Sequence, residues 1–404
     1  MKRRVVIECG AAQTRAALFE GEEALKFWLA PARGDEAEPR AVEDGDICLG
    51  RVTSVSKALH GAFVDIGDAS PAFLPFARND SPPPEGAIAI FGVKRPPLGA
   101  KGAVLFMNWR KDASPALRAE AQAEVQTNRR PRRLGASADA AVAIARKAAA
   151  FADNIVIDGV DAATALAIAG FESVTDDSAV FDADLGAAID EALLQAVVLP
   201  GGARMTIEET EALVAIDIDM GAAAETNAVM INDAVNRAAA ARLFRELSRR
   251  SIGGRVVVDF LPPPAVAAKR QAFAELLGSA DQDLFPRRGG KLAPDGIYDL
   301  TAPRREPSLL HRATEIAGAD WPQPGRRLKL DWRAKAAIGR LERRLREAPS
   351  RFVRLVASPD LAAYLRARPG WSARIGERFG ARFLIEEERS LGDRNFDIVE
   401  ARIR

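Results

Sequence analysis

Two apolar segments that each end in aspartate constrain the fold more than any other part of this chain. They are EALVAIDID at 211–219 and RVVVDF at 255–260, and a helix-like stretch separates them. Side chains alternate between two faces of an extended strand, so Asp217 and Asp219 share one face. A crossover of this length favours a parallel pair of neighbouring strands. The sequence therefore predicts an α/β unit in which Asp217 and Asp259 lie at the same edge of one sheet.

Carboxylates gathered at such an edge suggest a metal site. Ligands of open α/β sheets bind beyond the carboxyl ends of the strands, and Mg²⁺ prefers oxygen ligands. Single acids at strand ends also cap the loops that follow them. The spacing alone leaves both interpretations open.

The chain has 404 residues, which is more than one hydrophobic core usually supports, so several domains are expected. Apolar residues make up 48% and charged residues 28%, as in soluble globular proteins. The net charge of +1 does not indicate a partner, so any basic surface must come from local clustering. No apolar run reaches the ~20 residues of a membrane span. We therefore expect a soluble protein without a membrane partner.

Cysteine and histidine are rare. The chain holds Cys9, Cys48, His60 and His311, which supply no close cysteine pair for a zinc cage. A lone histidine without a placed partner carries little catalytic information, so both histidines are interpreted as structural or surface residues. Low cysteine content fits a reducing cytoplasm, where we expect this protein.

Five short strands are expected between residues 45 and 109, separated by Gly, Asp and Pro, and they suggest a small barrel of the OB type. Such barrels bind single-stranded nucleic acid through exposed aromatic and basic side chains. Phe63 and Phe73 are candidates for stacking on bases, and Lys101 for a phosphate contact. The alternative is that both phenylalanines belong to the barrel core.

Other segments show shorter signals. Strands are expected at 4–9, 15–19, 154–158 and 296–300; helices at 162–169, 185–193, 269–277 and 333–347; and a small α+β domain from residue 352 onward.

Several motifs occur in an order that resembles the ribonuclease E/G family. They are GDICLGRVTSV, HGAFVDIG, PAFLPF, KGAVLF, TEALVAIDID, IGGRVVVDF, GIYDLT and SPDLAAYL. The resemblance implies a mixed α/β and β multidomain fold, in which an OB-type barrel is inserted in an RNase H-like domain. A DNase I-like α/β nuclease domain and a small α+β domain follow. The implied parts are 1–40 and 113–200 (RNase H-like, with a helical segment), 41–112 (barrel), 201–310 (nuclease) and 311–404 (linker and C-terminal domain).

The resemblance also implies a function. The family cleaves single-stranded RNA endonucleolytically with Mg²⁺, in RNA turnover or ribosomal RNA processing, through attack by a metal-activated water. Asp217 and Asp259 match its catalytic metal-binding aspartates. Asp219 stands where the family usually has an asparagine beside the metal, and we expect it to be a third metal ligand or to support the other two. Mn²⁺ is an alternative cation, because oxygen ligands accept both. The residues matching RNA-contacting positions are Phe63, Phe73, Lys101 and Arg304.

The chain also departs from the family pattern. No close cysteine pair follows residue 310, so neither structural zinc nor a zinc-linked oligomer is expected, although a homo-oligomer of another kind is compatible with the sequence. The Arg-Thr element that recognises an RNA 5′-monophosphate is absent, which predicts reduced or lost sensing of the RNA end. Pro262, Asp295 and Ala302 replace family residues near the metal. These changes support an alternative function: a catalytically weak RNA-binding homologue acting as an RNA chaperone or assembly factor.

Overall fold

The computed structural model describes residues 2–32, 42, 45–77, 83–97, 101–111, 115–127, 130–134, 139–221, 228–263, 266–317, 325–394 and 396–401. The chain forms two compact units. One comprises Met1–Glu38, Asp139–Ala302 and Leu309–Arg404, and the other comprises Pro39–Ala138 and Pro303–Ser308. The protein is a mixed α/β chain of more than one domain, as the sequence predicts.

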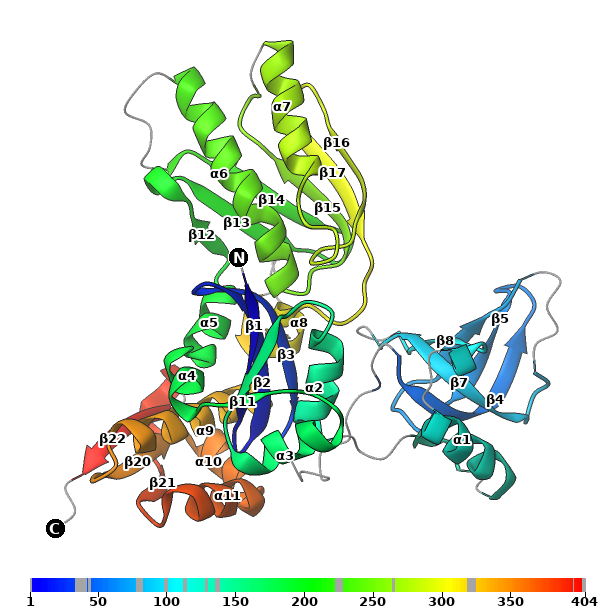
Figure 1. Cartoon of the computed structure of the whole chain (residues 1–404), viewed down its shortest axis with the longest axis vertical. Coiled ribbons are helices and arrows are strands. Elements are labelled where there is room, and N and C mark those ends of the chain that lie inside the picture. The colour runs from blue at the N-terminus through cyan, green and yellow to red at the C-terminus, as the bar shows by residue number, and fades with distance from the viewer. Residues whose placement is uncertain are drawn as a thin grey trace. The chain divides into compact units, whose positions relative to one another are not determined.

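The first sheet of the larger unit has five strands in the order β11-β10-β1-β2-β3 (Figure 1). Strands β1, β10 and β11 are parallel, whereas β1, β2 and β3 form an antiparallel meander. The strands are β1 (Arg3–Cys9), β2 (Gln13–Glu20), β3 (Glu23–Pro31), β10 (Asn154–Ile157) and β11 (Val174–Thr175).

Helices cover both faces of this sheet. Val5 and Ile7 of β1 pack with α2 (Ala140–Ala148) and α3 (Val160–Ile168) in one core. Val6 packs in a second core with α4 (Asp177–Asp182) and α5 (Leu185–Ala192). A strand buried on both faces reads as a continuous apolar run, as β1 does.

Strand β3 was absent from the sequence prediction. Its residues Leu25, Phe27, Trp28 and Leu29 are all buried, so the strand lacks the alternation that marks a strand with one solvated face. The neighbouring β1 and β2, which were predicted, pair with each other as expected.

The second sheet of this unit has six strands in the order β12-β13-β14-β15-β17-β16. Strands β14 and β15 are parallel, which confirms the strand, crossover and strand arrangement expected from the sequence. The strands are β12 (Ala196–Val198), β13 (Arg204–Glu209), β14 (Val214–Asp219), β15 (Gly254–Asp259), β16 (Arg288–Leu292) and β17 (Ile297–Ala302).

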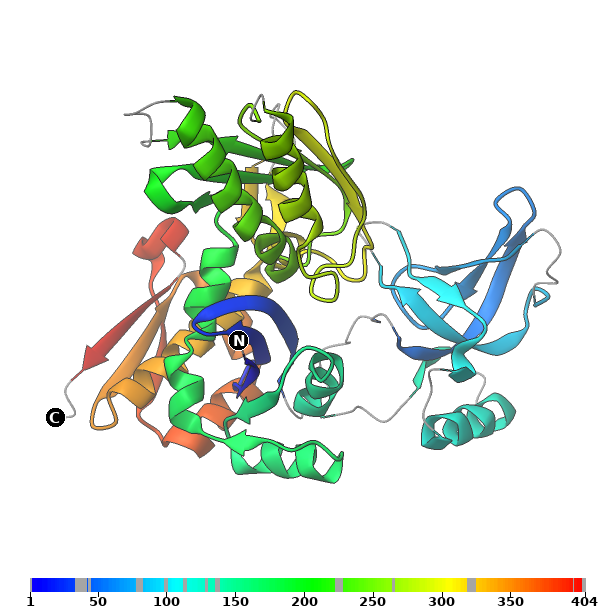
Figure 2. The same cartoon turned by 45° about the horizontal axis from the view of Figure 1, so that its top comes forward.

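Two helices, α6 (Ala228–Arg249) and α7 (Ala267–Gly278), lie on one face of the second sheet (Figure 2). Their residues Leu243 and Phe273 are fully buried in a core that includes Ile216 and Val258 of the central strands. The alternate side chains of β13, β14, β15 and β17 point to the opposite face. That face is the open face of the sheet, and it carries the polar residues discussed below.

The smaller unit contains a closed barrel with the strand order β5-β6-β8-β7-β4, in which β4 also pairs with β5. Five strands closed in this way fit an OB-type barrel, as the sequence predicts. The elements are β4 (Ile47–Ser56), β5 (Gly61–Asp65), β6 (Ala72–Pro75), β7 (Ile88–Arg95) and β8 (Val104–Phe106), joined by α1 (Pro115–Thr127) and β9 (Arg132–Leu134).

The C-terminal part of the larger unit is a three-stranded sheet, β21-β20-β22, packed with helices. The three strands expected there are present, and α11 was not expected. The elements are α8 (Leu309–Ala313), β18 (Thr314–Ala317), β19 (Gly325–Leu328), α9 (Leu330–Glu347), β20 (Phe352–Ala357), α10 (Pro359–Arg366), α11 (Pro369–Phe379), β21 (Phe383–Glu387) and β22 (Phe396–Ala401). Within the described ranges, no helix is both long enough and apolar enough to cross a membrane.

A buried carboxyl group lies where α9 meets the loop after β1. Both oxygens of Glu342 accept a hydrogen bond from the amide of Ala11, at 3.2 and 3.1 Å. Burial, and then the nearby charge of Glu8, raises the pKa of Glu342 to about 7 from its ordinary 4.5. The folded protein therefore favours the protonated form, because burial penalises a charged carboxylate.

We expect this group to make stability fall as the pH rises. Its stabilising contribution is complete below pH 4.5 and is lost as the pH passes through about 7. Glu342→Gln removes the ionisation but keeps an acceptor for Ala11, so the variant should be more stable than wild type at pH 8 by up to about 3 kcal/mol. Urea unfolding at pH 5 and pH 8 measures this, with exposed Glu347→Gln as the control. A stability difference between Glu342→Gln and wild type that is the same at both pH values would contradict the prediction.

Candidate metal centre and nucleic-acid interface

Asp217 and Asp259 are direct neighbours in the register of the parallel pair β14 and β15. Both are the last or nearly the last residues of their strands, and both are exposed on the open face. The flanking Ile216 and Val258 are buried under α6 and α7, which fixes the face that each aspartate occupies. The geometry expected from the sequence is therefore present, with two carboxylates side by side at the carboxyl edge of one sheet.

Several negatively charged side chains lie close together here. Loss of hydration, followed by the charges of Asp259, Asp219 and Glu208, raises the pKa of Asp217 above its ordinary value. Among the residues that the structure describes, the carboxylates of Asp217 and Asp259 have no hydrogen-bond or ion-pair partner. A bound cation would relieve this repulsion.

The residues present fit Mg²⁺. This ion is commonly held by one or two carboxylates, with waters and substrate phosphates as its remaining ligands. The described part of the chain contains no cluster of three or more His, Cys, Asp or Glu side chains arranged to hold a metal. The site is therefore an open pair of carboxylates, and a cation bound there would retain positions for water and phosphate.

Asp219 differs from the other two aspartates. It lies on the same open face and lines the same shallow pocket as Asp217. One of its oxygens accepts a hydrogen bond from the amide of Gly221 at 2.5 Å, so that oxygen closes the turn after β14. The second oxygen is the one left for the expected role beside the metal, and this role stays a prediction.

Two residues near the aspartates were missed by the sequence analysis. Strand β13 pairs with β14 so that Thr206 is opposite Asp217 and Arg204 is opposite Asp219. Both line the pocket that also contains these two aspartates. The sequence does carry a signal for strand β13, because its buried residues, such as Met205, alternate with polar neighbours.

The aromatic candidates lie outside the barrel core. Phe63 of β5 and Phe73 of β6 are paired in register, with ring centroids 5.5 Å apart in an edge-to-face arrangement. Both are partly exposed, whereas Ala62 and Leu74 beside them are in the barrel core. The alternative that both phenylalanines are core residues is therefore wrong. A partly exposed aromatic pair of this kind suits stacking on bases.

The basic candidates are both exposed. Lys101 immediately precedes Gly102, whose Cα lies so close to the backbone of Pro71 that a Cβ there would be 1.9 Å from the Pro71 oxygen. Strand β8, which begins three residues after Lys101, pairs with β6 at Phe73. Lys101 therefore leads into the strand that neighbours Phe73 in the barrel. Arg304 lies just after β17, in the segment Pro303–Ser308 that groups with the barrel unit.

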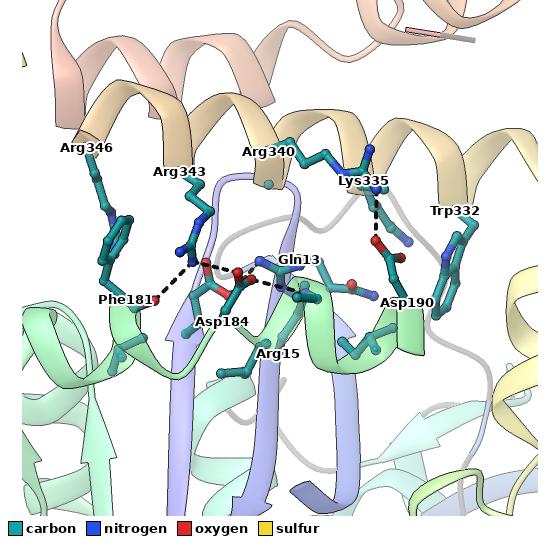
Figure 3. Close-up of a pocket in the computed structure, with 18 residues that line it drawn as sticks. Gln13, Arg15, Phe181, Asp184, Asp190, Trp332, Lys335, Arg340, Arg343 and Arg346 are labelled. Atoms are coloured by element: carbon teal, nitrogen blue, oxygen red, sulfur yellow. Dashed lines mark hydrogen bonds and ion pairs between the residues drawn. The ribbon is translucent and has the colours of Figure 1, made fainter. Parts of the chain in front are cut away.

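A more enclosed pocket lies elsewhere in the larger unit, between α9, the α4–α5 segment and the turn from β1 to β2 (Figure 3). Several cations line it, but each has a carboxylate partner. These pairs are Arg15 with Glu8, Lys335 with Asp331, Arg340 with Asp190, Arg343 with Asp184 and Arg346 with Asp158, at 2.6–3.2 Å. With its charges already compensated, this pocket has the character of a packed polar contact.

The fold thus defines a multidomain α/β protein with a closed barrel of OB type. Comparison with known proteins is more specific, because residues 122–304 match the model of the Ribonuclease E/G family. This part of the chain, from α1 to just after β17, is thus similar to the ribonuclease E/G family.

Similar curated proteins carry the same family name. The chain is 32% identical over 133 residues to a ribonuclease E/G-like chloroplastic protein of Arabidopsis thaliana, covering 31% of this chain and 13% of that protein. It is 32% identical over 124 residues to ribonuclease E of Escherichia coli, covering 30% of this chain and 12% of the relative. It is 30% identical over 144 residues to ribonuclease E of Synechocystis, covering 35% of this chain and 20% of that protein. The chain thus matches a fifth or less of the length of each of these relatives.

Proposed function

We propose that this protein is a Mg²⁺-dependent endoribonuclease that cleaves single-stranded RNA, in RNA turnover or ribosomal RNA processing in the cytoplasm. The observation that carries the proposal is the exposed pair of carboxylates, Asp217 and Asp259, in register at the edge of a sheet. The names of the relatives support the choice of ribonuclease over other metal-dependent activities. We also propose the RNase H-like, barrel, nuclease and C-terminal parts that the sequence suggests.

Each of the candidate residues would have a distinct role in binding the cation or the RNA. Asp217 and Asp259 would hold the cation, and Asp219 would bind it through its remaining oxygen or contact it through a water. A divalent cation in this position supplies charge stabilisation at the scissile phosphate and lowers the pKa of an attacking water. Phe63 and Phe73 stack on bases, while Lys101 and Arg304 neutralise phosphates.

Cleavage of an end-labelled, A/U-rich single-stranded RNA tests the proposal. We expect internal cuts with Mg²⁺ and none with EDTA, with partial activity in Mn²⁺ because oxygen ligands accept both ions. A 5′-hydroxyl and a 5′-phosphate substrate should be cut at similar rates, since the sequence predicts reduced or lost sensing of the RNA end. Tight RNA binding without cuts in any of these metals would instead support the RNA chaperone or assembly factor.

The aromatic pair of the barrel provides a separate prediction. Stacking contributes about 1–3 kcal/mol per base, so Phe63→Ala combined with Phe73→Ala should weaken RNA binding by at least roughly tenfold. Fluorescence anisotropy with labelled single-stranded RNA measures the affinity. The matched control is Phe63→Leu with Phe73→Leu, which keeps apolar contacts but removes the aromatic faces. It should bind as weakly as the alanine variant, and wild-type affinity in the leucine variant would exclude stacking.

A further inference from the structure

We propose that Arg204 binds a phosphate of the RNA beside the two metal-binding aspartates. This inference rests on the proposed function and extends its site to strand β13. Among the described polar side chains of the pocket, Arg204 is a cation beside two carboxylates and a hydroxyl.

The strand register places Arg204 at this site. Asp259, Asp217 and Thr206 form one row across β15, β14 and β13, and Arg204 and Asp219 form the next row. Rows of side chains on one face of a strand are about 7 Å apart, because alternate residues rise by ~3.3 Å each. An extended arginine side chain spans a distance of this size. Its guanidinium can therefore reach a phosphate bound at the aspartate pair or the phosphate next to it.

The guanidinium is also available. Arg204 is exposed, and within the parts of the chain that the structure describes it has no ion pair or hydrogen bond from its side chain. Arg255 on the same face provides the contrast, since two of its nitrogens bind Asp299, at 3.1 and 2.6 Å. Of these two arginines, Arg204 is the one whose five donors are free for a ligand.

A cation at the position of Arg204 would have an electrostatic role. Asp217, Asp219, Asp259 and Glu208 all lie on the open face near Arg204, and carboxylates so close together repel one another. The same field repels an approaching phosphate. A cation next to the carboxylates offsets this repulsion locally, and the planar guanidinium can bind phosphate with two parallel hydrogen bonds.

The backbone holds β13 in place at this point. A Cβ on Gly221, whose φ is +53°, would lie 2.3 Å from the carbonyl oxygen of Gly202. The turn after β14 therefore packs directly against the turn that leads into β13, two residues before Arg204. Close packing of these turns fixes the start of β13, so the base of the Arg204 side chain does not depend on a flexible loop.

The test measures RNA binding as a function of salt in an Asp259→Asn background, where cleavage does not complicate the measurement. Each phosphate contact with single-stranded nucleic acid contributes about 0.7 to the slope of log affinity against log salt concentration. Adding Arg204→Gln should reduce the magnitude of this slope by about 0.7 and weaken binding roughly tenfold. Arg204→Lys should keep the slope but recover only part of the affinity, because lysine cannot form the paired hydrogen bonds.

The control is Arg237→Gln on α6, an exposed arginine on the helical side of the same sheet, which should leave slope and affinity unchanged. An unchanged slope in Arg204→Gln would overturn the inference, whether or not the wild-type protein cleaves RNA. Conversely, a protein that binds RNA through Arg204 but makes no cuts would sustain the inference and refute the proposed nuclease. Absence of any RNA binding by the Asp259→Asn background would overturn both.

Discussion

Asp259→Asn is expected to lower the rate of RNA cleavage by roughly a thousandfold or more while RNA binding persists. The substitution keeps the size of the side chain but removes one of the two charges that would hold the cation. Stabilisation of phosphate charge by a bound metal is worth several kcal/mol, and each ~1.4 kcal/mol changes the rate tenfold. Asp217→Asn should have an effect of the same size, because the two residues are neighbours in register.

Single-turnover cleavage of end-labelled RNA measures the cleavage rate, and anisotropy titrations measure RNA binding separately. Asp233→Asn is a suitable control, because Asp233 pairs with Arg237 on α6, behind the sheet. That variant should cleave at nearly the wild-type rate. Cleavage by Asp259→Asn at the wild-type rate would show that the metal, if any, is bound elsewhere.

The sequence was sufficient to predict this carboxylate pair, and the reason is local. Two apolar runs joined by a helical crossover have few ways to pair, and Asp217 and Asp259 stand at matching positions in these runs. Strand β3 was missed because it is buried on both faces and shows no alternation. Strand β13 was missed although Met205 and Ile207 alternate with polar residues, and with it Arg204 was missed as well.

Contacts between distant parts of the chain were beyond the sequence analysis for a different reason. The partners of Asp158 are Arg346 and Arg378, which lie 188 and 220 residues further along the chain. No periodicity or motif links positions so far apart, because their meeting depends on how whole helices dock. Because Asp158 is fully buried, the folded protein needs these two arginines to compensate the charge of its carboxylate.

Asp158 joins the C-terminal helices to the first sheet. It follows β10 at the carboxyl edge of that sheet, where one oxygen accepts the amide of Cys9 at 2.6 Å. The other oxygen receives Arg346 of α9 at 2.8 Å and Arg378 of α11 at 2.6 Å. Burial alone would raise the pKa of Asp158, but Arg378, the Cys9 amide and Arg346 outweigh it and hold the pKa below its ordinary value.

We therefore expect Asp158→Asn to destabilise the larger unit by about 3–5 kcal/mol at pH 7, because it leaves two arginines without their buried counter-charge. The midpoint of urea unfolding measures this. The control is Asp190→Asn, which breaks a half-exposed ion pair with Arg340 and should cost less than about 1 kcal/mol.

The pH dependence of the unfolding free energy provides an independent test of the direction in which folding shifts the pKa of Asp158. A carboxyl group whose pKa is lowered by folding stabilises the protein above its unfolded pKa, here 3.8, and the contribution is lost as the pH falls through the folded value. The stability gap between wild type and Asp158→Asn should therefore be constant from about pH 5 to pH 7 and shrink only in stronger acid. A gap that narrows already near pH 6, or equal costs for Asp158→Asn and Asp190→Asn, would mean that the buried carboxylate does not hold the C-terminal helices to the sheet.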